Sequence, residues 1–177
     1  MHQLLLNRSI YEELILSHLP EARQFVWLVT ADIKDMYIET AKGFAPLLQL
    51  LAELVANGVA IRLIHAKEPG PRFREDFDRF PQLVANDLFE RILCPRVHTK
   101  AIIIDNRLAF VGSPNLTGAG MGSKHRDKRN FEAGFLFDDR QQIRELSDWV
   151  DALYLGEFCP SCRRREFCQD PLDSGFG

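Results

Sequence analysis

The chain has 177 residues and a mass of 20.3 kDa, which fits one domain able to bury roughly 70% of its unfolded surface. Hydrophobic residues make up 46% and charged residues 27%, a balance that excludes wholesale disorder. The net charge of −3 excludes a bulk polycation, so a polyanionic partner would have to meet a local basic patch.

The N-terminal half is expected to alternate helices and strands. Ser9 opens a capping-box pattern, followed by a helix to about residue 19. An apolar, β-branched run predicts a buried strand over 25–30, and leucines at helical spacing predict a helix between Pro46 and Gly58. A strand over 59–65 then completes a β-α-β unit, which implies a parallel pair of strands.

The remaining segments are interpreted in chain order, with residues 31–43 left open. The expected elements are a surface connection over 67–82, a helix over 83–93, strands over 96–105 and 108–111, a loop over 116–130, a strand over 131–137 and a helix over 140–154.

This order of elements predicts an α/β fold with a mixed sheet flanked by helices. The domain is expected to span 1–156, and a polar tail over 157–177 carries three of the four cysteines. The apolar run at residues 4–6 is too short for a signal peptide, and about 18 consecutive apolar residues occur nowhere. We therefore expect a cytoplasmic protein without a membrane span.

The most informative pattern begins at His98 and Lys100. Because alternate residues of a strand face the same side, these two side chains should project together. A tight turn at residues 105–107 should return the chain antiparallel and bring Gly112, Ser113 and Asn115 near His98.

These residue types suit the chemistry of a phosphodiester. An imidazole can attack phosphorus, and a lysine ammonium and an asparagine amide can hold the phosphate oxygens in the transition state. Gly112 permits a close backbone approach, and the Ser113 hydroxyl adds a donor. Because no carboxylate cluster accompanies these residues, the predicted site needs no metal or other cofactor for catalysis.

The same pattern resembles the HKD signature of the phospholipase D superfamily. The resemblance covers about residues 98–132, and its fixed positions are filled by His98, Lys100, Asp105, Gly112, Ser113 and Asn115, with Glu132 as the acidic residue that often follows. It implies a phospholipase D-like fold and phosphodiesterase activity.

The resemblance also implies roles for the residues. His98 would form a phosphohistidine, while Lys100 and Asn115 would bind phosphate with support from Ser113. Glu132 would hydrogen-bond the histidine and fix its tautomer. Asp105 is expected to be structural because it lies seven residues from His98.

The reaction requires a second histidine as general acid, and the chain carries only one complete signature. The other His-x-Lys, at His65 and Lys67, lacks the later positions and is interpreted as the end of a strand. A single signature predicts a homodimer in which the two copies of His98 face each other across a two-fold axis.

The expected substrate is nucleic acid. The loop over 116–130 carries four cations that should border the site, namely Lys124, Arg126, Lys128 and Arg129. Size and the single signature resemble the dimeric endonuclease branch of the superfamily, so a DNA or RNA nuclease is favoured. A lipid phosphodiesterase or phosphatidyltransferase is the alternative, and a catalytically inactive nucleic-acid-binding module is a third.

The cysteines form a separate pattern. Cys159, Cys162 and Cys168 have the spacing C-x2-C-x5-C, and Cys94 lies far upstream. Four thiolates suit structural zinc or a [4Fe–4S] cluster. The spacing resembles the cysteine staple of RecB-like iron–sulfur nucleases, and bound metal would fasten the tail near His98.

Overall fold

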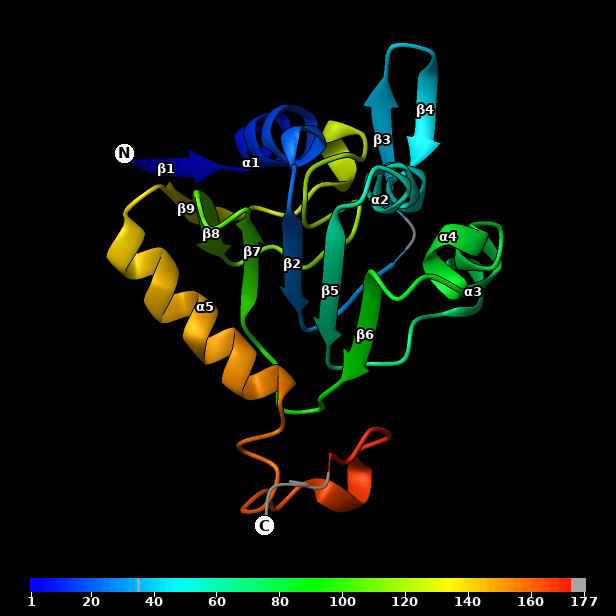
Figure 1. Cartoon of the computed structure of the whole chain (residues 1–177). Helices are drawn as coiled ribbons and strands as arrows, with labels where there is room; N and C mark the ends of the chain where they lie inside the picture. The colour runs from blue at the N-terminus through cyan, green and yellow to red at the C-terminus, as the bar shows by residue number, and fades with distance from the viewer. Residues whose placement is uncertain (35, 173–177) are drawn as a thin grey trace.

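A seven-stranded mixed sheet forms the centre of the protein in a computed structural model that describes residues 1–34 and 36–172 (Figure 1). The strand order is β1-β9-β8-β7-β2-β5-β6. Three strands are parallel to one another, namely β2 (Phe25–Thr30), β5 (Ala60–His65) and β6 (Phe89–Leu93). The antiparallel strands are β1 (His2–Leu6), β7 (Lys100–Ile104), β8 (Leu108–Gly112) and β9 (Ala133–Phe137). The predicted α/β fold with a mixed sheet is confirmed.

Helices cover both faces of this sheet. One face packs against the segments α1 (Arg8–Ile10), the π-helical η1 (Tyr11–His18), α2 (Leu47–Ala56), α3 (Pro71–Phe77) and α4 (Pro81–Val84). The other face packs against α5 (Arg140–Tyr154), through Ile143 and Val150. A hairpin of β3 (Tyr37–Thr40) and β4 (Gly43–Pro46) projects at the top of Figure 1, and the short 3-10 turns are η2 (Leu19–Glu21), η3 (Arg126–Lys128) and η4 (Arg165–Phe167). Among the described residues, every helix is too short or too polar to span a bilayer.

The elements with the strongest local sequence patterns lie where they were predicted. Helix α2 lies between Pro46 and Gly58, whose positive φ of 86° suits a glycine after a helix. Helix α5 has the predicted bounds and begins at Asp139, whose carboxylate accepts the backbone N–H of Gln142 at 2.9 Å.

Three predictions near the chain's surface are wrong. The predicted helix over 83–93 is instead α4 followed by the edge strand β6, because Asn86 forms a turn whose carbonyl and side chain accept the N–H groups of Phe89 and Leu88. The predicted connection over 67–82 contains α3, which buries Phe73. Ser9 bonds back to Leu6 rather than capping the first helix.

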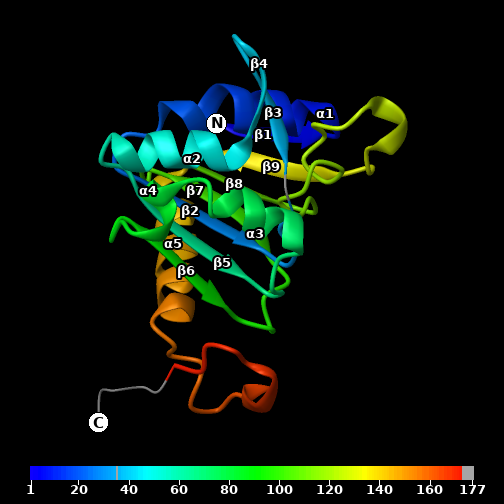
Figure 2. The same cartoon turned by 90° about the vertical axis from the view of Figure 1, so that its right-hand side faces the viewer.

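The sheet places one end of five strands together. Strands β2, β5 and β6 end where β7 begins and β8 finishes, so the segment before β7 and the loop after β8 meet at this edge (Figure 1). The tail over 157–172 lies beyond the same edge (Figures 1 and 2). The division into a domain over 1–156 and a tail stays a prediction, and residues 173–177 of that tail lie outside the described residues.

Candidate active site

His98 and Lys100 lie side by side at the start of β7. His98 is exposed just before the strand, and its Nδ1 is 3.3 Å from Nζ of Lys100, the first residue of the strand. Lys100 is only 9% exposed, and among the described residues no carboxylate lies within ion-pairing distance of its ammonium group. A buried cation without a counter-charge is costly, so this position favours an anionic ligand.

Strand β8 returns beside β7 as the hairpin pattern predicts. Gly112 lies opposite Lys100 in the register. A Cβ atom at Gly112 would lie 2.7 Å from both the Ala133 carbonyl oxygen and the Phe110 ring. The close approach expected at Gly112 is therefore made by β9 and by the Phe110 ring. These contacts leave no room for a side chain at Gly112, directly before Ser113 begins the loop.

Ser113 and Glu132 form the next part of the site. The Ser113 hydroxyl donates to the Glu132 carboxylate and accepts the backbone N–H of Ala133 at 3.1 Å. The other Glu132 oxygen accepts Asn130 Nδ2 at 3.0 Å, and Asn7 holds the Glu132 backbone through two hydrogen bonds of 2.8 and 3.0 Å. Within the described chain these groups occupy Glu132, so the implied hydrogen bond between Glu132 and His98 is not made.

Asn115 is oriented by the end of β2. Its Oδ1 accepts the backbone N–H of Asp32 at 3.1 Å and lies 3.4 Å from the hydroxyl oxygen of buried Thr30. The same hydroxyl accepts the backbone N–H of Leu116 at 3.0 Å. Because Oδ1 is engaged, the Asn115 Nδ2 group is the part of the amide left to donate to a ligand.

Four residues around this site were not found from the sequence. Thr30 and Asp32 orient Asn115, while Asn7 and Asn130 orient Glu132. The sequence did offer a signal for Thr30, because it is the one polar residue of the apolar run over 25–30 and stands at its end. The other three are polar loop residues without a local pattern.

Asp105 has the structural position that its distance from His98 predicts. Its carboxylate accepts the backbone N–H groups of Arg23, Gln24 and Phe25 at 2.8–2.9 Å. Asp105 and Asn106 both have φ near +50°, which matches the tight turn between β7 and β8. Asp105 therefore joins this turn to the start of β2.

The basic loop, which we define as residues 124–129, stands out from the body beside α1 (Figure 2). Lys124, Arg126 and Lys128 are exposed, Arg129 is partly exposed, and Asp127 lies 3.8 Å from Arg126. Arg8 anchors the preceding segment by donating to the Gly122 carbonyl at 3.1 Å. The basic loop thus lies just before the segment that carries Glu132 and leads into β9.

Comparison with protein families gives a match over residues 15–154 to the model described as "Cardiolipin synthase, PLD-like domain". The chain belongs to the phospholipase D-like domain family. The match includes the whole site from His98 to Glu132, as the signature predicted. No curated protein matches this phospholipase D-like chain.

Solved structures share the phospholipase D-like fold at low identity. NucT from Helicobacter pylori has a TM-score of 0.61 and 14% identity, and the match covers 85% of this chain and 93% of NucT. Nuc from Salmonella typhimurium, a phospholipase D family member, has a TM-score of 0.59 and 16% identity, with coverage of 85% and 93%. TrmBL2, an archaeal chromatin protein with a novel mode of DNA binding, has a TM-score of 0.57 and 14% identity, with coverage of 86% and 52%.

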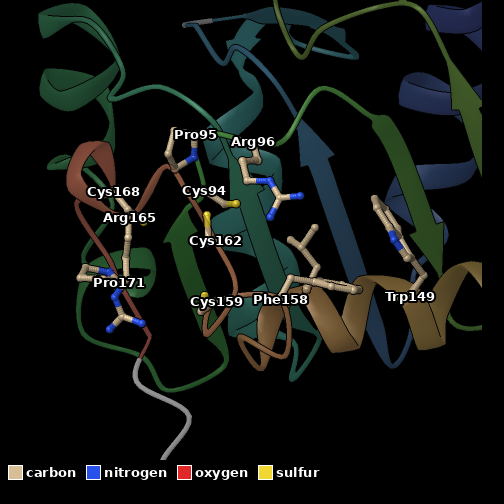
Figure 3. A pocket seen from close by; sticks show the side chains of 11 residues that line it. Cys94, Pro95, Arg96, Trp149, Phe158, Cys159, Cys162, Arg165, Cys168 and Pro171 are labelled. Atoms are coloured by element: carbon tan, nitrogen blue, oxygen red, sulfur yellow. The ribbon is translucent and has the colours of Figure 1, made fainter.

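The cysteines of this phospholipase D-like chain gather at a cavity that neither His98 nor Lys100 lines. Cys94, Cys159, Cys162 and Cys168 line one cavity (Figure 3). Among the described residues, no three His, Cys, Asp or Glu side chains converge closely enough to hold a metal ion. The comparisons likewise give no support to the resemblance to a RecB-like cysteine staple.

Proposed function

We propose that this phospholipase D-like domain is a metal-independent phosphodiesterase that cleaves nucleic acid as a homodimer through a phosphohistidine intermediate. The observation that carries the proposal is the pairing of exposed His98 with buried Lys100, which has no carboxylate partner among the described residues. A non-bridging oxygen of a phosphodiester would supply the missing negative charge and bring phosphorus next to the imidazole.

The reaction follows from these groups in two steps. A ring nitrogen of His98 attacks phosphorus, forming the N–P bond, and the bond to the leaving oxygen breaks as the partner's His98 protonates that oxygen. The partner's His98 then takes a proton from water, which attacks phosphorus and releases His98. Lys100 and the Asn115 amide stabilise the charge that develops on the non-bridging oxygens in both steps.

An uncovered apolar face supports the homodimer. Leu4, Phe135 and Val111 lie in one row across β1, β9 and β8, and Leu6 follows on the same face. All four side chains are exposed, because α5 packs on the neighbouring part of this face and not on them. Val111 lies two residues before Ser113, so a second copy seated here would lie close to the site.

Two features favour nucleic acid as the substrate. The basic loop presents cations beside Glu132, where they can follow a phosphate backbone. Phe131 is 96% exposed between the basic loop and Glu132, and an exposed ring can stack on an unpaired base. The size and single signature of the chain resemble the dimeric endonuclease branch of the superfamily.

A lipid substrate is the alternative, because the matching family model is described as a cardiolipin synthase domain. The exposed row of Leu4, Phe135 and Val111 could lie against lipid instead of a second copy. The third alternative, an inactive binding module, would retain nucleic-acid affinity without turnover.

The test measures turnover of single-stranded DNA, duplex DNA, RNA and phosphatidylcholine vesicles in the presence of EDTA. We expect cleavage of nucleic acid, loss of activity to background in His98→Ala, and a loss of roughly 100-fold or more in Lys100→Ala. Lys67→Ala, in the incomplete signature, is the matched control and should retain full activity. Cleavage of lipid alone, or binding of nucleic acid without cleavage, would overturn the proposal.

A further inference from the structure

A cavity of about 210 Å³ lies between the segment after β6, helix α5 and the tail, and all four cysteines of the chain line it (Figure 3). Cys94 comes from the segment between β6 and β7, whereas Cys159, Cys162 and Cys168 come from the tail. All four are free thiols and only partly buried. A chain that gathers its cysteines from two distant segments around one cavity has a use for sulfur there beyond filling a core.

Specific contacts hold the tail against this cavity. Asp170 accepts the backbone N–H of Leu93 at 2.8 Å, and the Cys168 thiol lies 3.8 Å from the Leu93 carbonyl oxygen. Gly156, with φ of 77°, turns the chain after α5, and a Cβ atom there would lie 2.7 Å from Leu172. Leu93, the last residue of β6, thus contacts the tail through both its backbone N–H and its carbonyl oxygen.

The tail folds into tight turns around its cysteines. The backbone N–H of Cys162 donates to the Cys159 carbonyl at 3.1 Å, which closes a C-x-x-C turn, and the backbone N–H of Cys168 donates to the Arg165 carbonyl at 3.1 Å. These turns bring the three tail cysteines to the cavity that Cys94 also lines.

The size of the cavity distinguishes between metal centres. Four thiolates on one zinc ion lie about 3.8 Å apart, because each Zn–S bond is about 2.3 Å. Among the described residues no three potential ligands converge in that way, and the four cysteines instead line a cavity of about 210 Å³ together with apolar side chains such as Phe158. A polynuclear centre spreads its four thiolates over separate iron atoms and needs such a space.

We propose that Cys94, Cys159, Cys162 and Cys168 ligate one iron–sulfur cluster, built from iron ions and inorganic sulfide, that fastens the tail to the edge of the sheet carrying His98. The cluster is structural. Cys94 lies four residues before His98 in the sequence. Arg96, midway between these two residues, also lines the cavity. Fastening Cys94 therefore fixes the segment that leads into the candidate active site, whatever substrate that site takes.

The test is metal and sulfide analysis of the full chain purified without oxygen. We expect brown protein with equal amounts of iron and acid-labile sulfide, and loss of both in Cys94→Ala and Cys162→Ala. Ser161→Ala, within the same turn, is the matched control and should keep the wild-type content. Electron paramagnetic resonance after reduction should show a cluster signal in the wild type and in Ser161→Ala alone.

Three results would overturn this proposal: stoichiometric zinc in place of iron, no bound metal, or pairs of disulfides detected by mass spectrometry. Should a cysteine variant fail to fold, the iron and sulfide content of the wild-type chain decides the question. None of these measurements depends on catalytic activity, so they are independent of the proposed nuclease function.

Discussion

Asp105 and Lys100 are both charged residues of the β7–β8 hairpin with little side-chain exposure, but their surroundings differ. The Asp105 side chain, 5% exposed, accepts three backbone N–H groups and lies 3.4 Å from Arg107. Lys100, 9% exposed, has His98 as its hydrogen-bonding neighbour. The fold itself supplies the hydrogen bonds of the aspartate, whereas among the described residues no carboxylate pairs with the lysine.

The contribution of Asp105 to stability should depend on pH. Burial alone would raise the pKa of Asp105, but the three backbone donors and Arg107 together hold the pKa below its usual value. A carboxyl whose pKa is lowered by folding contributes stability above its unfolded pKa, about 3.9, and loses that contribution as pH falls through the folded pKa.

We therefore expect Asp105→Asn to lower the free energy of unfolding by about 2 kcal/mol at pH 7, and by progressively less on acidification below about pH 4. Urea denaturation at a series of pH values measures the difference. Asp87→Asn, at an exposed position, serves as the control and should change little. A gap between Asp105→Asn and the wild type that stays constant down to pH 2 would contradict the assignment.

Thr30 should act as a positioning residue for Asn115. Thr30→Val removes the hydroxyl near Asn115 Oδ1 and leaves the Leu116 N–H without its acceptor. We expect kcat to fall about tenfold or more with a smaller change in KM, because the amide is misplaced in the transition state. Thr30→Ser keeps the hydroxyl and should restore kcat, whereas equal losses in both variants would show a packing role instead.

At the scale of elements, the sequence predicts what local contacts determine. Helix α5 has its own cap at Asp139 and one apolar face, and the β7–β8 turn depends on two adjacent residues with positive φ. By contrast, β1 and β6 are edge strands whose existence depends on pairing with β9 and β5, which their own sequences do not reveal.

The same distinction applies to the candidate site. His98 and Lys100 are two residues apart in the segment that leads into β7, so their proximity could be predicted, although the strand predicted from residue 96 begins only at Lys100. The hydrogen bond from Asp32 to Asn115 spans 83 residues, and the bond between Glu132 and Asn7 spans 125. Contacts of that length arise from the packing of the whole sheet, and no local periodicity encodes them.

The basic loop gives a prediction at this scale. Replacing Lys124, Arg126 and Lys128 by alanine should weaken binding of single-stranded DNA and reduce the slope of log K against log salt by about 2, since each lost phosphate contact contributes about 0.7. Titration at several salt concentrations measures this slope.

A charge-matched variant tests whether the position of the cations matters. Lys42, Arg140 and Arg144 are exposed on the β3–β4 hairpin and on α5, and their replacement by alanine should leave the slope unchanged. Equal slopes for both triple variants would assign the effect to net charge and not to the basic loop.

At the scale of the whole molecule, one face of the sheet is incompletely covered. Helix α5 packs over Ala109 and Phe137, but the next row of the same face exposes Leu4, Val111 and Phe135. Val111 of this row lies two residues before Ser113, so the row reaches the end of the sheet where the candidate site lies.

Phe135→Glu should convert the proposed homodimer into a monomer and remove its activity, because a buried carboxylate opposes association and each site then lacks the second histidine. Light scattering and turnover measure the two effects. Phe44→Glu, at an exposed position of the β3–β4 hairpin, should leave both unchanged. A fully active Phe135→Glu monomer would contradict the shared site.

The burial of Lys100 without an internal carboxylate links occupancy of the site to thermal denaturation. Inorganic phosphate at ten times its dissociation constant should stabilise the native state by about 1.4 kcal/mol, raising the melting temperature. Lys100→Met should melt at a higher temperature than the wild type in phosphate-free buffer and gain nothing from added phosphate. Under the proposed function, the hairpin gives up resistance to heat at Lys100 in exchange for binding an anion.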